Sequence, residues 1–298
     1  IGVVAAIGFF WQEHRMGEEA ILPLAMFRNK PVGVASIASV LIGVAMFGGL
    51  AALPLYLQIV KGATPTEAGL LLLPMTLGIM IGSILSGQLI SRTGRYRVFP
   101  IVGSALLTIS LFIFHYVAYD TPLWQTMIVM TMFGVGLGFN FQPLTLAVQN
   151  AVPPQQIGVA TSTATFTRQI GGTLGTAVFL SILFSTASEK ITTALAAAVP
   201  TQEFQAALAD PANAAVAEQF AAAQSGGGAA TSVLSDSSFL TGLDERLAKP
   251  FLIGFSEAMD LVFLTGSAIL VLGFLVMLML PSVELRKSSG YSERVIAE

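Results

Sequence analysis

The sequence predicts an all-α membrane protein, a polytopic bundle of transmembrane helices, and three observations support this fold class. Hydrophobic residues make up 54% of the chain and charged residues only 10%, too few to cover a surface that faces water. Several apolar runs exceed the ~20 residues that a helix needs to cross the hydrocarbon core of a bilayer. Basic residues cluster between some of these runs, as in cytoplasmic loops. Because backbone within lipid must satisfy its own hydrogen bonds, each run is expected to form a helix.

The clearest predicted span is the run from Ala68 to Ser91, which contains no ionisable residue. Three arginines follow it within six positions, Arg92, Arg95 and Arg97. Arginines at the end of a span favour the cytoplasmic side of the membrane. This stretch therefore predicts both a membrane helix and its orientation.

A capping box is predicted at the start of this span, in the tetrapeptide Thr64-Pro65-Thr66-Glu67. Thr64 is the expected N-cap, Pro65 suits the first helical position, and the Glu67 side chain can reach back to the cap. Glu67 is also a candidate protonatable carboxylate near a membrane face. The capping role is its structural alternative.

The whole chain is predicted to hold six complete transmembrane helices and the end of a seventh. Breaks between apolar runs come from polar and proline-rich turns, and a long Ala-, Ser- and Gly-rich stretch suits a solvated loop. The predicted segments in order are the end of a preceding helix (1–16), a cytoplasmic connector (17–30), five helices (31–186), an extracytoplasmic loop (187–249), the last helix (250–281) and a cytoplasmic tail (282–298). Because the chain starts at Ile1 inside an apolar run, we expect it to be a fragment of a longer protein.

The positions of lysine and arginine agree with strict alternation of these segments across the membrane. If the turn at residues 92–97 is cytoplasmic, nine basic residues lie inside and four outside, besides Arg168 within a span. The four outer residues are Lys61, Lys190, Arg246 and Lys249. Small residues at spacings of two and four, in segments 78–86, 134–138 and 171–175, further predict close contacts between membrane helices.

The segment G-Q-L-I-S-R-T-G-R-Y-R at residues 87–97 resembles the signature between the second and third helices of a major facilitator half. Its matching positions are Gly87, Arg92, Gly94, Arg95 and Arg97. The runs P-T-E-A-G-L-L-L-L-P, V-P-P-Q-Q-I-G-V-A-T-S and F-T-R-Q-I-G-G-T-L-G-T-A resemble the fourteen-helix drug:proton antiporters of the EmrB/QacA type. The resemblance covers nearly the whole chain, as the C-terminal half of such a transporter.

This resemblance implies a proton-coupled multidrug efflux transporter of the cell (inner) membrane, working by alternating access. It implies amphipathic drug-like substrates, protons, the lipid bilayer and a missing N-terminal half as partners, with no cofactor and no nucleic acid. Ser91 occupies the acidic position of the signature, so an aspartate latch is not carried over. The signature arginines are expected to bond helix-end carbonyls or lipid phosphates, and Gly94 to permit a tight turn.

Arg168 is the only ionisable residue predicted at mid-membrane depth, so it should face protein or a water-filled cavity. It could belong to the substrate cavity, or act as a clamp that bonds backbone carbonyls. Its candidate acceptors on the preceding span are Asn140, Gln142 and Gln149. Phe47 and Phe141 are aromatic candidates for the cavity wall, with lipid or core packing as the alternative.

Glu257 and Asp260 lie at i and i+3 near the outer end of the last span, so they share a helix face. They are candidate protonatable groups, or part of a solvated helix end. His14 and His115 fall on opposite sides of the predicted topology, so no metal site is expected. Without a nucleophile–base pair or metal cluster at membrane depth, the chain is not expected to be an enzyme. The alternatives to drug efflux are transport of a metabolite or lipid, and a non-transporting membrane scaffold or sensor.

Overall fold

The computed structural model describes residues 24–213 and 243–281, together with a few residues before position 24. Most of the segments predicted at 1–16 and 17–30, and the whole tail at 282–298, lie outside the described residues, as does His14. Within the described ranges every regular element is a helix, which confirms the predicted all-α class.

Six long helices occupy the six predicted spans. Five of them are long and apolar enough to cross a membrane, when α3 and α4 are counted as one; the sixth, α5, is apolar but has only 17 residues. The long helices are α2 (Lys30–Ile59), α4 (Leu73–Thr93), α5 (Val98–Phe114), α6 (Leu123–Asn150), α7 (Ile157–Ala198) and α11 (Glu245–Leu278). The short elements are η2 (Leu24–Arg28), α3 (Pro65–Leu71), η3 (Pro154–Gln156), α8 (Gln202–Leu208) and η4 (Pro211–Asn213).

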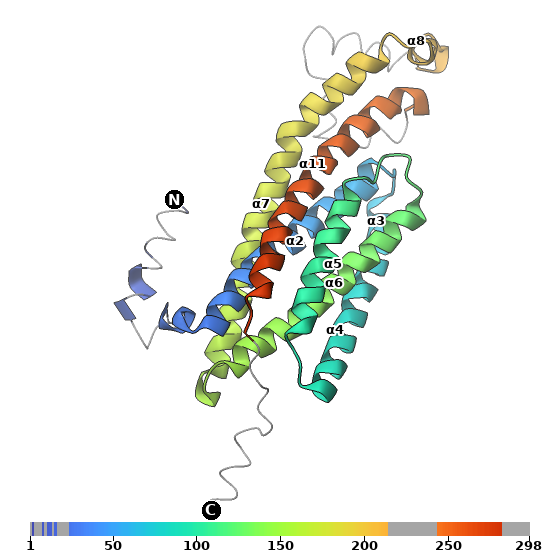
Figure 1. Cartoon of the computed structure of the whole chain (residues 1–298). Coiled ribbons are helices and arrows are strands. Elements are labelled where there is room, and N and C mark those ends of the chain that lie inside the picture. The colour runs from blue at the N-terminus through green and yellow to red at the C-terminus, as the bar shows by residue number, and fades with distance from the viewer. Residues whose placement is uncertain are drawn as a thin grey trace, which may run out of the picture.

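The turns between the helices alternate between two ends of the bundle (Figure 1). The start of α2, the α4–α5 turn, the α6–α7 turn and the end of α11 lie at one end. At this end the Asn29 side-chain amide donates a hydrogen bond to the Ala151 carbonyl, at 2.8 Å. The α2–α3 and α5–α6 turns and α8 lie toward the other end. This is the predicted alternation; which end faces the cytoplasm remains a prediction.

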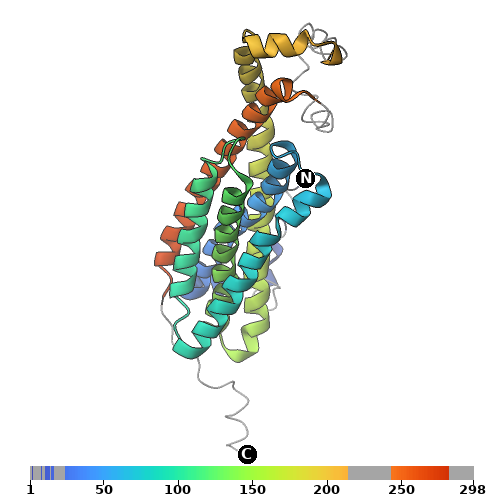
Figure 2. The same cartoon turned by 90° about the vertical axis from the view of Figure 1, so that its right-hand side faces the viewer.

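Two long helices extend into the stretch 187–249, whose place outside the membrane remains a prediction. Helix α7 continues to Ala198 and α11 begins at Glu245. The Ala-rich stretch is helical because alanine is the best helix former and because Ala187, Ile191 and Leu195 form a buried stripe along α7. At 1.5 Å per residue, α7 is about 63 Å long, twice the ~30 Å hydrocarbon core. The ends of α7 and α11, with α8, therefore project beyond the other helices (Figure 2).

Two helix pairs pack closely through glycines, as the small-residue spacing predicts. Gly78 and Gly82 of α4 face the backbone of α6 at Thr131 and Val135. Gly171 and Gly175 of α7 in the same way face the backbone of α2 at Val40 and Val44. The backbones approach so closely at these glycines that a Cβ would not fit. The glycine contacts therefore fix the position of α4 against α6 and of α7 against α2.

Candidate functional site

A row of polar side chains runs along one face of α7. Its members recur every three or four residues and are exposed or half-exposed: Ser162, Thr165, Gln169, Thr173 and Thr176. Several of the threonine hydroxyls bond a carbonyl of their own helix, as Thr173 does with Gln169 O at 3.1 Å, which satisfies part of their hydrogen-bonding capacity. Polar groups at membrane depth are expected to face protein or a water-filled cavity rather than lipid.

A hollow of about 570 Å³ lies over this polar face, between α7 and α2. Its volume falls within the ~300–1,000 Å³ range of small-molecule sites. Gly172 lets the Phe47 ring pack directly against α7, because a Cβ there would collide with the ring. The lining combines amide and hydroxyl groups with apolar side chains: Phe47, Gln169, Gly172, Thr173, Thr176, Ala177 and Leu180. Such a surface can hold an amphipathic molecule.

Arg168 is half-buried and contacts an aromatic ring. Its guanidinium carbon lies 4.9 Å from the centroid of Phe141 on α6, a cation–π geometry. In the part of the chain that the structure describes, no hydrogen bond joins this guanidinium to a helix carbonyl, and the choice between the cavity role and the clamp role of Arg168 stays a prediction. Arg168 is also absent from the lining of the hollow, although Gln169 beside it belongs there. The structure therefore brings Arg168 together with Phe141, and Phe47 together with the polar face of α7.

The three predicted amide acceptors of Arg168 make other contacts. Asn140 is fully buried, and its amide nitrogen donates to Gly136 O at 2.7 Å, while its Oδ1 has no hydrogen-bond partner among the described residues. The Gln149 amide donates to Thr161 Oγ1 at 2.9 Å, and Gln142 is exposed. Residues two positions apart on a helix point in nearly opposite directions, so Asn140 and Gln142 could not both face Arg168.

The predicted signature turn clasps the end of α11. Gly94 ends α4 in the left-handed conformation, with φ of 68°, which confirms the predicted tight turn. One Arg97 Nη atom donates to Leu278 O at 2.8 Å, the predicted bond from an arginine to a helix-end carbonyl. Tyr96, a residue that sequence reasoning missed, is buried and donates from its hydroxyl to Pro281 O at 3.0 Å. Arg92 and Arg95 are exposed, and Gly87 faces open space.

The three candidate protonatable residues have different surroundings. The Glu67 carboxylate accepts hydrogen bonds from the backbone nitrogen and hydroxyl of Thr64, both at 2.9 Å, which confirms the predicted capping box. Glu257 forms an ion pair with Lys190 at 3.2 Å. Asp260, in contrast, buries an Oδ1 atom that has no hydrogen-bond partner among the described residues. The His115 ring lies next to it, with Nδ1 3.2 Å from the Asp260 backbone oxygen.

Lys61 joins two of the turns at the end opposite the signature turn. Its Nζ donates to the carbonyl oxygens of Tyr119 and Thr121, both at 2.7 Å. Partial burial lowers the pKa of Lys61, since removal from water disfavours the charged form. This lysine thus ties the α2–α3 turn to the α5–α6 turn.

Comparison with known proteins gives related membrane transporters. Residues 1–176 match the family model of the Major Facilitator Superfamily. A tetracycline resistance determinant of Streptomyces rimosus is 35% identical over 277 residues, which cover 92% of this chain and 78% of the relative. An MFS-type transporter of Mycobacterium tuberculosis is 33% identical over 287 residues, which cover 96% of this chain but 37% of the relative. The multidrug transporter protein MdtP of Bacillus subtilis is 26% identical over 166 residues, 56% of this chain and 30% of the relative.

The family match extends over more than half of the chain and agrees with the bundle of apolar helices. The Streptomyces relative aligns with almost the whole of it at 35% identity. The chain is therefore a multi-pass membrane protein, and it belongs to the Major Facilitator Superfamily.

Proposed function

We propose that this chain takes part in the export of amphipathic small molecules, and that the polar face of α7 forms part of the substrate path. The observation that carries this proposal is the hollow between α2 and α7, where Gln169, Thr173 and Thr176 lie beside Phe47. In lipid these polar groups would be unfavourable, whereas in a water-filled cavity they can bind a substrate. The names of the Streptomyces and Bacillus relatives support export of tetracyclines or other drugs.

The polar face of α7 is also an argument that a second set of helices, the other half of the transporter, packs against this bundle. It is exposed or half-exposed in this bundle, so another set of helices is needed to enclose it and keep it from lipid. We propose that the helices of this chain form the C-terminal half of a fourteen-helix antiporter, that the enclosing helices belong to its N-terminal half, and that the two halves rock about a site between them. Arg168, held against Phe141, would place a positive charge next to this path.

The intact gene expressed in a drug-sensitive bacterium tests the export function. Cells should accumulate less tetracycline or ethidium than cells with an empty vector. The double variant Gln169→Leu with Thr173→Val removes polar groups from the hollow and should abolish most of this difference at equal membrane expression. The control is Leu174→Val, an exposed apolar residue of the same helix outside the hollow. Unchanged export by the double variant would refute the role of the hollow.

We further propose that export is driven by proton influx, with Asp260 as the protonatable residue of this half. Its buried Oδ1, which has no hydrogen-bond partner in the described part of the chain, distinguishes it from Glu257, whose charge is matched by Lys190. His115, the residue that follows α5, lies beside it. Inside-out vesicles given an acidic interior should accumulate the drug, and a protonophore should stop this. Asp260→Asn should lose this pH-driven uptake, whereas Glu257→Gln should keep most of it; the reverse order would contradict the assignment.

A further inference from the structure

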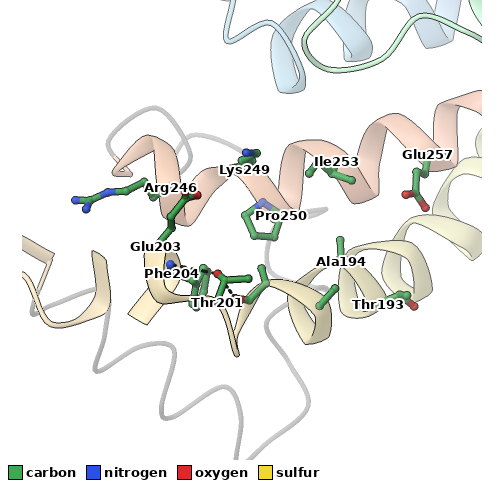
Figure 3. A pocket seen from close by; sticks show the side chains of 12 residues that line it. Thr193, Ala194, Thr201, Glu203, Phe204, Arg246, Lys249, Pro250, Ile253 and Glu257 are labelled. Carbon is green, nitrogen blue, oxygen red and sulfur yellow. Dashed lines mark hydrogen bonds between the residues drawn. The ribbon is translucent and has the colours of Figure 1, made fainter. Parts of the chain in front are cut away.

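The projecting ends of α7 and α11 enclose a second cavity, far from the polar hollow. It has a volume of about 340 Å³ and lies between the last turns of α7, helix α8 and the first turns of α11 (Figure 3). From Gln169 to Thr193 helix α7 rises about 36 Å. The polar hollow and the second cavity therefore lie on the same helix but about 36 Å apart along it. The lining residues are Thr193, Ala194, Ala197, Ala198, Thr201, Glu203, Phe204, Arg246, Lys249, Pro250, Ile253 and Glu257.

The floor of this outer cavity is apolar. Ala194 of α7 points toward α11, while Pro250 and Ile253 lie on the opposite wall (Figure 3). The side chain of Phe204, a residue of α8, is buried. Since α7 is about twice as long as the hydrocarbon core is thick, this part of the molecule stands in water. An apolar hollow with polar groups at its edge and in contact with water is a common form of ligand site.

Most charges around the outer cavity are already matched within the protein. Glu257 pairs with Lys190 at 3.2 Å, and Arg246 pairs with Asp244 at 2.7 Å. Hydrogen bonds from the side chain and backbone of Arg246 hold the pKa of Asp244 well below its usual range, so this pair stays charged at neutral pH. Asp210 lies 3.9 Å from the same guanidinium and adds a second negative partner.

Glu203 and Lys249 form no ion pair within 4 Å in the described part of the chain, and the charge of Glu203 acts on Arg246, which already has Asp244 and Asp210 as partners. The Glu203 carboxylate extends from α8 toward the first turn of α11, whereas Lys249 projects from the side of α11 that faces away from α8 (Figure 3). Segments 187–213 and 243–257 together carry six acidic and three basic residues, a net charge of −3. A local excess of negative charge raises the concentration of cations near the surface.

We propose that the outer cavity binds an amphipathic organic cation, separately from the substrate path. Its apolar body would lie between Ala194, Pro250 and Ile253, and its positive charge would face Glu203. The apolar contacts supply most of the affinity, and the carboxylate selects the sign of the charge. This inference does not rest on the proposed export function, because it concerns other residues and predicts binding rather than transport.

Fluorescence of a single introduced cysteine tests the proposal on the intact protein in detergent. This chain contains no cysteine, so Thr193→Cys labelled with bimane, in an otherwise cysteine-free protein, reports from the cavity wall. The matched control is Thr192→Cys, an exposed neighbour that does not line the cavity. Tetraphenylphosphonium should change the emission at position 193 saturably and leave position 192 unchanged. Tetraphenylborate, an anion of the same shape, should bind more weakly at position 193.

Two further variants test the parts of the site. Glu203→Gln should raise the half-saturating concentration of tetraphenylphosphonium roughly two- to fivefold, the effect of losing one partly exposed charge pair. Ala194→Trp should fill the cavity and abolish the response. Equal responses at positions 192 and 193, binding of the borate as tight as that of the phosphonium, or an unchanged Glu203→Gln variant would each overturn the proposal. In the Gln169→Leu, Thr173→Val background the response should persist even where export is lost.

Discussion

Gly82→Ala should destabilise the bundle, because α4 and α6 touch through their backbones at this position. A Cβ on Gly82 would lie 2.6 Å from the Val135 carbonyl oxygen and 3.2 Å from Gly138 Cα. Ordinary van der Waals contact begins at 3.4 Å, so the two helices would have to separate by about 0.8 Å. Backbone atoms cannot rotate away as a flexible side chain can, and the strain is therefore carried by the whole helix pair.

The magnitude follows from two opposing effects. Overpacking a close contact usually costs about 1–3 kcal/mol. Alanine in place of glycine within a helix returns at most about 1 kcal/mol. The difference is a net loss of about 0–2 kcal/mol, and the contact with rigid backbone atoms places Gly82→Ala in the upper half of this range. Gly87 provides a control on the same helix, since no atom lies within 4 Å of the position of its Cβ. Gly87→Ala should be neutral or stabilising by up to about 1 kcal/mol.

Thermal unfolding of the purified protein in detergent measures this difference. Heated samples are separated by size-exclusion chromatography, and the remaining monodisperse fraction gives an apparent melting temperature. Gly82→Ala should melt several degrees below the wild type, and Gly87→Ala at or above it. If Gly82→Ala melts at the wild-type temperature, α4 and α6 do not approach as closely as the structure shows, and the argument from backbone contact fails.

Three further predictions concern the turns. Gly94→Val should lose about 1–2 kcal/mol in the same unfolding assay, because only glycine adopts a φ of 68° without strain. Gly158→Ala, at a helical position with open space, should lose little stability. Equal stabilities of the two variants would contradict the left-handed cap. Arg97→Met should free the end of α11 from the α4–α5 turn. A cysteine introduced at the buried position Leu280 should then react faster with a thiol reagent. Labelling as slow as with Arg97 present would show that this hydrogen bond does not hold the end of α11. Lys61→Met leaves two loop carbonyls without their donor and should lower the free energy of unfolding by about 1–2 kcal/mol. Lys61→Arg should keep part of this stability. An unchanged melting temperature of the Met variant would count against the lysine bridge.

Much of this fold could be predicted from the sequence because each membrane helix is selected largely by its own segment. Length and hydropathy decide whether a run can cross lipid, independently of the other runs. The capping box at Thr64 and the turn at Gly94 are equally local, and both are confirmed. The extension of α7 to Ala198 and the start of α11 at Glu245 could not be placed in this way, because a helix beyond the lipid carries no strong hydropathy signal.

The partners of the site residues could not be predicted in the same way. Arg168 was expected to meet amide side chains of α6, and it meets the Phe141 ring instead. The polar face of α7 could have been found from its spacing of three and four residues, although its position opposite Phe47 could not.

The amino-acid sequence was enough to predict the membrane segments, their caps and the small residues that allow close approach. Which side chains meet across the helices, where the two cavities lie and how far α7 and α11 project became known only from the arrangement of the helices. Insertion into lipid depends on each segment separately, whereas contacts depend on how neighbouring helices are rotated and shifted against one another. That rotation and shift are set by the packing of many residues at once, including glycine contacts such as those of Gly82 and Gly171.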